Sequence, residues 1–279
     1  MNVILAESAG FCFGVKRALD IAFRTAKVNK NVFMLGDIVH NEEVVNRIRK
    51  TGIKKIKNLG VGVGKTLLIR AHGTGKDILN KAKKSGYKIV DATCPMVKEI
   101  HNIAARMESK GYQIIVAGDK KHDEVLGIIG QLRNKAIVID DIKLIDQDKI
   151  RKIDKACVVV QSTQNLETVT DIVGFLKKRI KELKFFNTVC GPTRMKQEEI
   201  KKIPLNNDAV VIIGSKNSAN TRRLYEISRS LNPKSYWINS KKEIKPAWFK
   251  WVNSIGVTAG ASTPETTIQD IVNYLSELN

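Results

Sequence analysis

The sequence lacks features that would place it in several large classes of protein. It has no uninterrupted apolar run of the roughly 18 to 20 residues that a membrane-spanning helix requires. Aromatic residues make up 6% of the chain, too few to predict a surface on which nucleic-acid bases stack. No G-x-G-x-x-G motif marks a nicotinamide or flavin site. Because the first residues, MNVILAESAGF, also carry no basic leader, we expect a cytoplasmic protein that is not bound to a membrane.

Cysteine is scarce as well, since the chain has 4 and no C-x-x-C pair. Zinc sites usually contain such local pairs, so their absence argues against structural zinc. Cytosolic thiols are kept reduced, which makes metal binding or catalysis a better explanation than disulfides. Cys157 lies in the apolar stretch KACVVVQ, and we predict that it is a buried core residue.

Acidic residues are outnumbered by basic ones. The chain has 48 Lys and Arg against 28 Asp and Glu, for a formal net charge of +20. The lysines are spread over the whole chain, mostly on the polar sides of helical patterns, so a solvated surface is the expectation. Steering of a small anionic substrate also fits this charge. Nucleic acid is not an expected partner, because a basic cluster on one face is missing.

Three segments around cysteines resemble one another. They are ESAGFCFGVKRAL, VDATCPMVKEI and NTVCGPTRMKQEE, and they contain Cys12, Cys94 and Cys190. In each, the cysteine follows a short extended stretch and precedes a helical pattern. The first two helices are expected to bury one apolar face each, formed by Val15, Ala18, Leu19, Ala22, Phe23 and Ala26, and by Met96, Val97, Ile100, Ile103, Ala104 and Met107.

Two further sets of segments recur with these. Each cysteine is followed after 24 residues by a glycine at the end of an apolar strand, namely Gly36, Gly118 and Gly214. Four residues beyond the glycines are His40, His122 and Ser218, and six residues beyond are Glu42, Glu124 and Asn220. The third set, LLIRAHGTG, CVVVQSTQN and IGVTAGAST, contains His72, Ser162, Thr163 and Ser262.

Strands that alternate with helices predict an α/β fold with mainly parallel sheets. We expect three similar α/β units, at residues 1–85, 86–182 and 183–279, arranged around a pseudo-threefold axis. Ligands of parallel α/β sheets collect at the carboxyl ends of the strands, and the conspicuous residues follow such ends. The sequence therefore predicts one central chamber for a cofactor and a substrate.

Three thiolates at helix starts, where the positive end of the helix lowers the thiol pKa, predict a metal site. Gaps of 82 and 96 residues between the cysteines fit a cluster at a junction of units. Electron-transfer clusters use four cysteines, so three would leave one iron open to a substrate.

The polar loops predict a pocket for a diphosphate. Ser218, Ala219 and Asn220 lie between a strand and a helix, where hydroxyl, amide and backbone N–H groups surround phosphates, and Ser262 lies in a similar loop. With His40, His72 and His122 they would form the ring around the ligand. Glu124 is the candidate proton donor, although a solvated carboxylate at a helix start, as at Glu42, is the alternative. His101, inside a helix, is expected to be structural.

These segments resemble a known family. GFCFGVKRA, IVHN, AHG, DATCP, GDKKHDEVLG, GSKNSANT and VTAGAS, from residue 10 to residue 262, are similar to the signature of the 4-hydroxy-3-methylbut-2-enyl diphosphate reductases. The resemblance implies one 4Fe-4S cluster per chain on Cys12, Cys94 and Cys190, and Glu124 as the proton donor. It implies that an allylic diphosphate is held by His40, His72, His122, Ser162, Thr163, Ser218, Ala219, Asn220 and Ser262.

By the same resemblance, the reaction removes a hydroxyl group reductively and yields isopentenyl and dimethylallyl diphosphate, with electrons from a donor such as ferredoxin or flavodoxin. The chain departs from the family at Ser162, usually threonine, at Ala219, serine in some relatives, and at the residue before Thr193. The alternatives are a non-redox iron-sulfur dehydratase or quinolinate-synthase-like enzyme and, least favoured, a zinc-containing nucleic-acid-binding protein.

Overall fold

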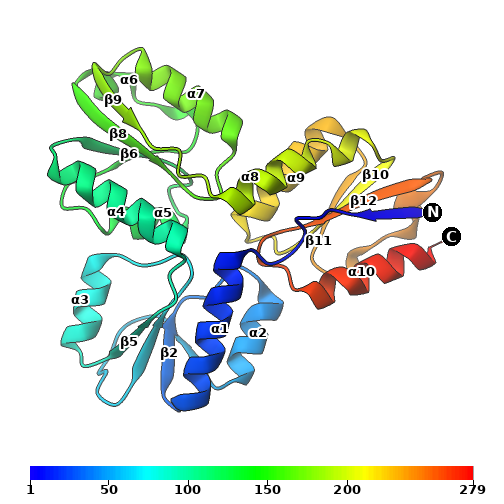
Figure 1. The fold of residues 1–279 in the computed structure, drawn as a ribbon, viewed down its shortest axis with the longest axis horizontal. Helices are drawn as coiled ribbons and strands as arrows, with labels where there is room; N and C mark the ends of the chain where they lie inside the picture. The colour runs from blue at the N-terminus through cyan, green and yellow to red at the C-terminus, as the bar shows by residue number, and fades with distance from the viewer. Residues whose placement is uncertain (279) are drawn as a thin grey trace. The chain divides into compact units, whose positions relative to one another are not determined.

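The computed structural model describes residues 1–278 and contains three parallel four-stranded sheets with one common strand order (Figure 1). The first sheet runs β3 (Lys54–Ile56), β2 (Val32–Leu35), β4 (Thr66–Ile69), β5 (Lys88–Asp91). The second runs β7 (Ile137–Ile139), β6 (Gln113–Ala117), β8 (Lys155–Val160), β9 (Glu182–Phe185). The third runs β11 (Ser235–Ile238), β10 (Ala209–Ile213), β12 (Ser254–Ala259), β1 (Asn2–Leu5). The predicted fold of three similar parallel α/β units is confirmed.

The last strand of each sheet is the strand that precedes a cysteine. β1, before Cys12, pairs in parallel with β12, so Asn2 lies opposite Ser254 in the third sheet. β5, before Cys94, pairs with β4 in the first sheet, and β9, before Cys190, pairs with β8 in the second. The sheets therefore divide the chain at other residues than 85 and 182. The sequence repeat begins at each cysteine. Each sheet, in contrast, is completed by the strand that directly precedes a cysteine of the following repeat.

Helices follow the three recurring segments in the same order. α1 (Phe13–Val28), α4 (Pro95–Ser109) and α8 (Gly191–Ile200) begin directly after the cysteines. α2 (Glu42–Lys50), α5 (Asp123–Ile129) and α9 (Ala219–Leu231) follow the recurring glycines. α3 (Lys76–Lys84), α7 (Leu166–Lys177) and α10 (Glu265–Glu277) follow the third set. Shorter elements are α6 (Gln147–Arg151) and the 3-10 turns η1 (Ile142–Leu144), η2 (Ile203–Leu205), η3 (Lys241–Glu243) and η4 (Pro246–Phe249).

The predicted apolar faces of α1 and α4 are largely buried. Ala18 and Ala22 of α1 are fully buried, as is Ala104 of α4, in agreement with the helical period. Met96 differs, because it is 46% exposed in the first turn of α4. Cys157 is fully buried in β8, and burial raises the pKa of its thiol to about 11, as expected of a core residue.

The recurring glycines make room for a side chain from a neighbouring segment. A Cβ atom at Gly36, where φ is +75°, would overlap with the Arg70 guanidinium. At Gly118 it would lie 2.8 Å from the Cβ atom of Gln161, and at Gly214 it would lie 2.7 Å from the Thr221 hydroxyl. Glycine therefore recurs because a chain segment passes close to the end of each strand.

By its internal contacts the chain forms two compact parts. The terminal part consists of Met1–Lys16, Val39–Arg47 and Gly191–Asn279, and it contains the third sheet. The central part consists of Arg17–Ile38 and Ile48–Cys190, and it contains the first and second sheets. Within residues 1–278 no helix is both long enough and apolar enough to cross a bilayer. The predicted pseudo-threefold axis and central chamber stay predictions.

Candidate functional site

Each of the three predicted cysteine ligands is fixed by the same backbone hydrogen bond. In the terminal part, Cys12 N–H donates to the carbonyl of Ala261 at 3.1 Å. In the central part, Cys94 N–H donates to Ala71 and Cys190 N–H donates to Ser162, both at 3.0 Å. The accepting residues all follow a third-set strand, β12, β4 or β8. The repeat seen in the sequence is therefore also a repeat of local geometry.

The surroundings of the cysteines fit metal ligation. Cys94 is the N-cap residue of α4, and Cys12 and Cys190 immediately precede α1 and α8. All three are half-buried, whereas Cys157 is inaccessible. A helix N-terminus stabilises a thiolate, which is the form that binds iron or zinc. The donor set of three accessible thiols suits the predicted iron-sulfur cluster.

A buried lysine of α8 lies close to the loop that precedes Cys12. The Lys196 ammonium donates to the carbonyl of Ser8 and, at 3.1 Å, to that of Ala259. Burial lowers its pKa to about 8, and Cys12 and Glu199 act in the opposite direction. The Glu199 carboxylate accepts from Glu7 N–H at 2.6 Å and from Ser8 N–H at 3.1 Å. Two side chains of α8 thus hold residues 7–8.

The terminal part also brings together His40 and Ser262. The Ser262 hydroxyl donates to the backbone carbonyl of His40 at 3.2 Å, and Ser262 is buried. Ser262 directly follows Ala261, whose carbonyl accepts from Cys12. Of the predicted site residues, His40, Ser262 and Cys12 are therefore linked through one short loop.

The start of α9 has the properties of an anion-binding site. Ser218 is its N-cap, and the hydroxyl oxygen accepts from Thr221 N–H at 3.3 Å. Ala219 and Asn220 follow in the first turn, where backbone N–H groups have no acceptor within the helix. Asn220 is 5% exposed, and its side-chain nitrogen has no hydrogen-bond partner among residues 1–278. A buried amide donor is costly unless a ligand satisfies it, so this turn fits an oxyanion.

The central part brings His72 and His122 together. Their rings are 5.5 Å apart and nearly perpendicular, at 87°. His122 is the N-cap of α5, and its Nδ1 atom accepts from Glu124 N–H at 3.2 Å. An accepting Nδ1 requires that the proton of a neutral ring is on Nε2. His122 can therefore donate from Nε2 to a ligand.

Glu124 and Ser162 form a buried pair in the central part. Glu124 is 2% exposed, and its carboxylate accepts from the Ser162 N–H at 2.6 Å and from the Ser162 hydroxyl at 2.8 Å. The neighbouring Thr163 hydroxyl instead accepts from the Gln161 amide at 3.0 Å. Ser162 also accepts from Cys190 N–H. Ser162 is thus joined to the Glu124 carboxylate through its N–H and hydroxyl groups, and to Cys190 through its backbone carbonyl.

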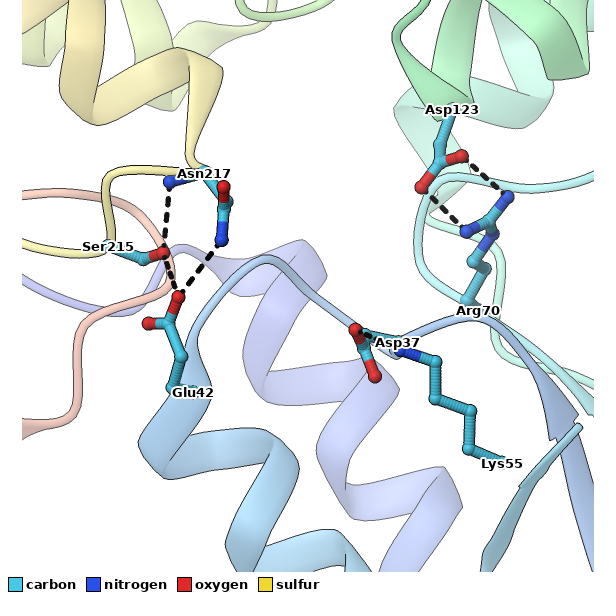
Figure 2. Close-up of polar contacts among 7 residues, drawn as sticks. All are labelled: Asp37, Glu42, Lys55, Arg70, Asp123, Ser215 and Asn217. Carbon is cyan, nitrogen blue, oxygen red and sulfur yellow. Dashed lines mark hydrogen bonds and ion pairs between the residues drawn. The ribbon is translucent and has the colours of Figure 1, made fainter. Parts of the chain in front are cut away.

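Glu42, the repeat equivalent of Glu124, has other surroundings. It is exposed, and one carboxylate oxygen accepts from the Ser215 hydroxyl at 2.9 Å and from the Asn217 amide at 3.1 Å, as Figure 2 shows. These partners lie in the loop before Ser218. Glu42 therefore supports a loop, whereas Glu124 is shielded from water.

Several residues around the site were not expected from the sequence. Gln161 supports Thr163 and also accepts from Asp119 N–H at 2.9 Å. Arg70 and Asp123 form an ion pair next to the predicted histidines. The sequence did contain one signal for these residues, because Gln161 and Arg70 are polar residues that directly follow an apolar strand. His101, which we predicted to be structural, is buried beside Gly73 and Gly127.

The fold and the site together define a class of protein: three parallel α/β units of one strand order, each with a cysteine at the start of a helix. The chain belongs to the LytB protein family, whose model matches residues 3–276.

Curated relatives cover the whole chain. A 4-hydroxy-3-methylbut-2-enyl diphosphate reductase of Aquifex aeolicus is 39% identical over 282 residues, covering 100% of this chain and 97% of that relative. The enzyme of the same name from Pelobacter propionicus is also 39% identical, covering 100% and 99%. The resemblance stated from the sequence motifs is confirmed.

Two solved structures are similar to the chain. One is an (E)-4-hydroxy-3-methyl-but-2-enyl diphosphate reductase, described as the terminal enzyme of the non-mevalonate pathway; it is 40% identical, with a TM-score of 0.73, and 99% of this chain and 100% of that chain are covered. The other is the E-1-hydroxy-2-methyl-but-2-enyl-4-diphosphate reductase of Plasmodium falciparum, which is 28% identical, with a TM-score of 0.91 and coverage of 99% and 88%.

Proposed function

We propose that this chain is a 4-hydroxy-3-methylbut-2-enyl diphosphate reductase. The reaction breaks the allylic C–O bond, releases the hydroxyl as water, and consumes two electrons and two protons to give isopentenyl or dimethylallyl diphosphate. Full-length relatives with this printed name support the assignment. The observation that carries it is the repeated hydrogen bond by which Cys12, Cys94 and Cys190 are fixed at three helix starts.

These three cysteines would hold one 4Fe-4S cluster. When bound, a cluster with one iron free of cysteine supplies electrons and a Lewis acid for an oxygen ligand. The protein contributes a half-buried setting and helix N-termini that favour thiolates. Electrons would come from an external protein such as ferredoxin or flavodoxin, and the +20 charge of the chain would favour an acidic donor.

The diphosphate would be bound by polar side chains and backbone N–H groups of the predicted site residues. Asn220 offers a buried amide nitrogen, and the backbone N–H groups of Ala219 and Asn220 point out of the first turn of α9. His122 offers an Nε2 donor, with His72 beside it. The full proposed set is His40, His72, His122, Ser218, Ala219, Asn220 and Ser262.

Glu124 would deliver a proton to the leaving oxygen. As a carboxylate it accepts from the Ser162 hydroxyl, and once protonated it can donate back to that oxygen, which frees the Ser162 hydrogen for a ligand. Burial keeps bulk water away from this exchange. Ser162 is therefore proposed as the hydroxyl closest to the proton transfer, and Thr163, held by Gln161, as a lesser contact.

The substitution Glu124→Gln tests the proton assignment. Glutamine retains an acceptor for Ser162 but cannot deliver the proton, so kcat should fall about 10²-fold to 10⁴-fold. Iron content and substrate KM should change little. Both are measured on anaerobically purified protein with a chemical reductant and excess substrate.

Glu42→Gln is the matched control, because Glu42 is the repeat-equivalent carboxylate. Its exposed side chain contacts Ser215 and Asn217, so this variant should retain kcat and raise KM by at most about threefold. Normal turnover of Glu124→Gln, or an equal loss of kcat in both variants, would contradict the assignment of Glu124 as the proton donor.

A further inference from the structure

Arg70 and Asp123 form a bidentate ion pair within the central part of the chain. Arg70 Nη1 lies 2.6 Å from one carboxylate oxygen of Asp123, and Nη2 lies 2.9 Å from the other, as Figure 2 shows. Their side chains are 19% and 25% exposed, so water screens the pair only in part. Two parallel N–H···O bonds fix direction as well as distance.

The two partners come from different sheets of the central part. Arg70 directly follows β4 of the first sheet, and Asp123 is the first residue of α5, which follows β6 of the second sheet. The pair therefore joins a loop of one sheet to a helix start of the other.

Each partner is close in sequence to proposed site residues. Arg70 is two residues before His72, and Asp123 lies between His122 and Glu124. The rings of His72 and His122 are in edge contact, at 5.5 Å. A shift of one loop relative to the other would change this contact and the direction of the Nε2 donor of His122.

The fold makes specific room for the guanidinium. Gly36 lies against Arg70, and a Cβ atom there would collide with Nη1. Gly36 also has φ +75°, which favours glycine. The recurring glycine of the first unit thus leaves space for the Arg70 guanidinium where it binds Asp123.

From this geometry we infer that Arg70 and Asp123 are positioning residues for the diphosphate-binding histidines and for Glu124. The pair touches neither the substrate nor the reacting atoms in this account. It sets the distance between the loop that carries His72 and the turn that carries His122 and Glu124. The inference rests on the proposed function, because it assumes that these side chains bind and protonate one ligand.

A double-mutant cycle tests the inference. The variants are Arg70→Gln, Asp123→Asn and the double variant, and inorganic pyrophosphate is the binding probe, measured by calorimetry on the anaerobic holoenzyme. Each single variant should weaken pyrophosphate binding and raise the substrate KM about tenfold, and the double variant should be no worse than either single one. Asp123→Glu, which keeps a carboxylate, should recover most of the affinity.

Lys55→Met is the matched control. Lys55 makes a single ion pair with Asp37 at 2.7 Å, also in the central part and also drawn in Figure 2. The Lys55 side chain is 40% exposed, so the Lys55→Met substitution should leave pyrophosphate affinity and KM unchanged. Thermal unfolding of all variants separates loss of stability from loss of positioning, because a purely structural pair would lower Tm without changing affinity in the folded protein.

Additive losses in the cycle, or unchanged affinity in both single variants, would overturn the inference. A parent protein that binds no pyrophosphate would overturn it as well, since no diphosphate site would be left to position. A parent protein that binds pyrophosphate with the expected coupling but never reduces the substrate would contradict the proposed function and leave the positioning role intact.

Discussion

At the scale of single residues, the same position in the repeat serves different purposes. Glu42 and Glu124 both lie six residues after a recurring glycine. Glu124 is buried against Ser162, whereas Glu42 is exposed and contacts Ser215 and Asn217. The sequence predicted both the candidate acid and its alternative, a solvated helix-start carboxylate. The two glutamates differ in burial, which depends on packing from other elements and therefore leaves no local signal in the sequence.

His101 gives a prediction for the acid sensitivity of the fold. Burial lowers the pKa of its imidazole from 6.5 to about 4; Asp91 opposes this shift, and Lys76 and Lys98 add to it. Between pH 6.5 and 4 the unfolded chain binds more protons, so the free energy of unfolding falls on acidification, by about 3 kcal/mol from this residue.

Replacing His101 by glutamine should flatten this part of the pH dependence. Urea unfolding at pH 4 to 7 measures the free energy of unfolding in the parent and in His101→Gln. Other groups titrate equally in both proteins, so the difference between the two curves isolates residue 101. Parallel curves would show that His101 does not cause the acid sensitivity.

At the scale of elements, α8 organises the loop before Cys12. Glu199 accepts two backbone N–H groups, of Glu7 and Ser8, and Lys196 donates to the carbonyl of Ser8. The contacts join residues 188 to 192 positions apart in the sequence, and both charged side chains bind backbone groups of one loop. The loop is therefore held by a helix that itself begins directly after another proposed ligand, Cys190.

Removing the Glu199 carboxylate should loosen residues 7–8. In Glu199→Ala, amide hydrogen exchange of Glu7 and Ser8 should accelerate about tenfold or more, because the lost bonds had a charged acceptor. Glu198→Ala, a change at the exposed neighbour, is the control and should leave both amides unaffected. Unchanged exchange in Glu199→Ala would mean that the loop is held by other contacts.

The elements themselves were largely predictable from local patterns. Helices after Cys12 and Cys94 follow the apolar period, and the recurring glycines mark strand ends. The sheet to which a strand belongs was harder to predict from the sequence. β1 pairs with β12, so Asn2 lies beside Ser254, and a pairing over that separation leaves no local signal. Met96 was misassigned to the core because helical period alone does not show which turn is covered.

At the scale of the whole molecule, the repeat predicted which residues would have equivalent positions. The cysteine N–H bonds to Ala261, Ala71 and Ser162 show that equivalence in three dimensions. The Arg70–Asp123 pair has no such trace in the sequence, because neither residue has a counterpart of the same type in the other units. Side-chain pairs between loops become visible only when the sheets are placed.

The central claim is that the chain is a cluster-containing reductase, and one measurement tests it most directly. The protein is purified without oxygen, its iron, sulfide and zinc are quantified, and consumption of 4-hydroxy-3-methylbut-2-enyl diphosphate is followed with and without a chemical reductant. We predict about four irons per chain and reductant-dependent consumption of the substrate. A cluster without turnover would instead favour a dehydratase-type enzyme, and zinc without iron would contradict the account.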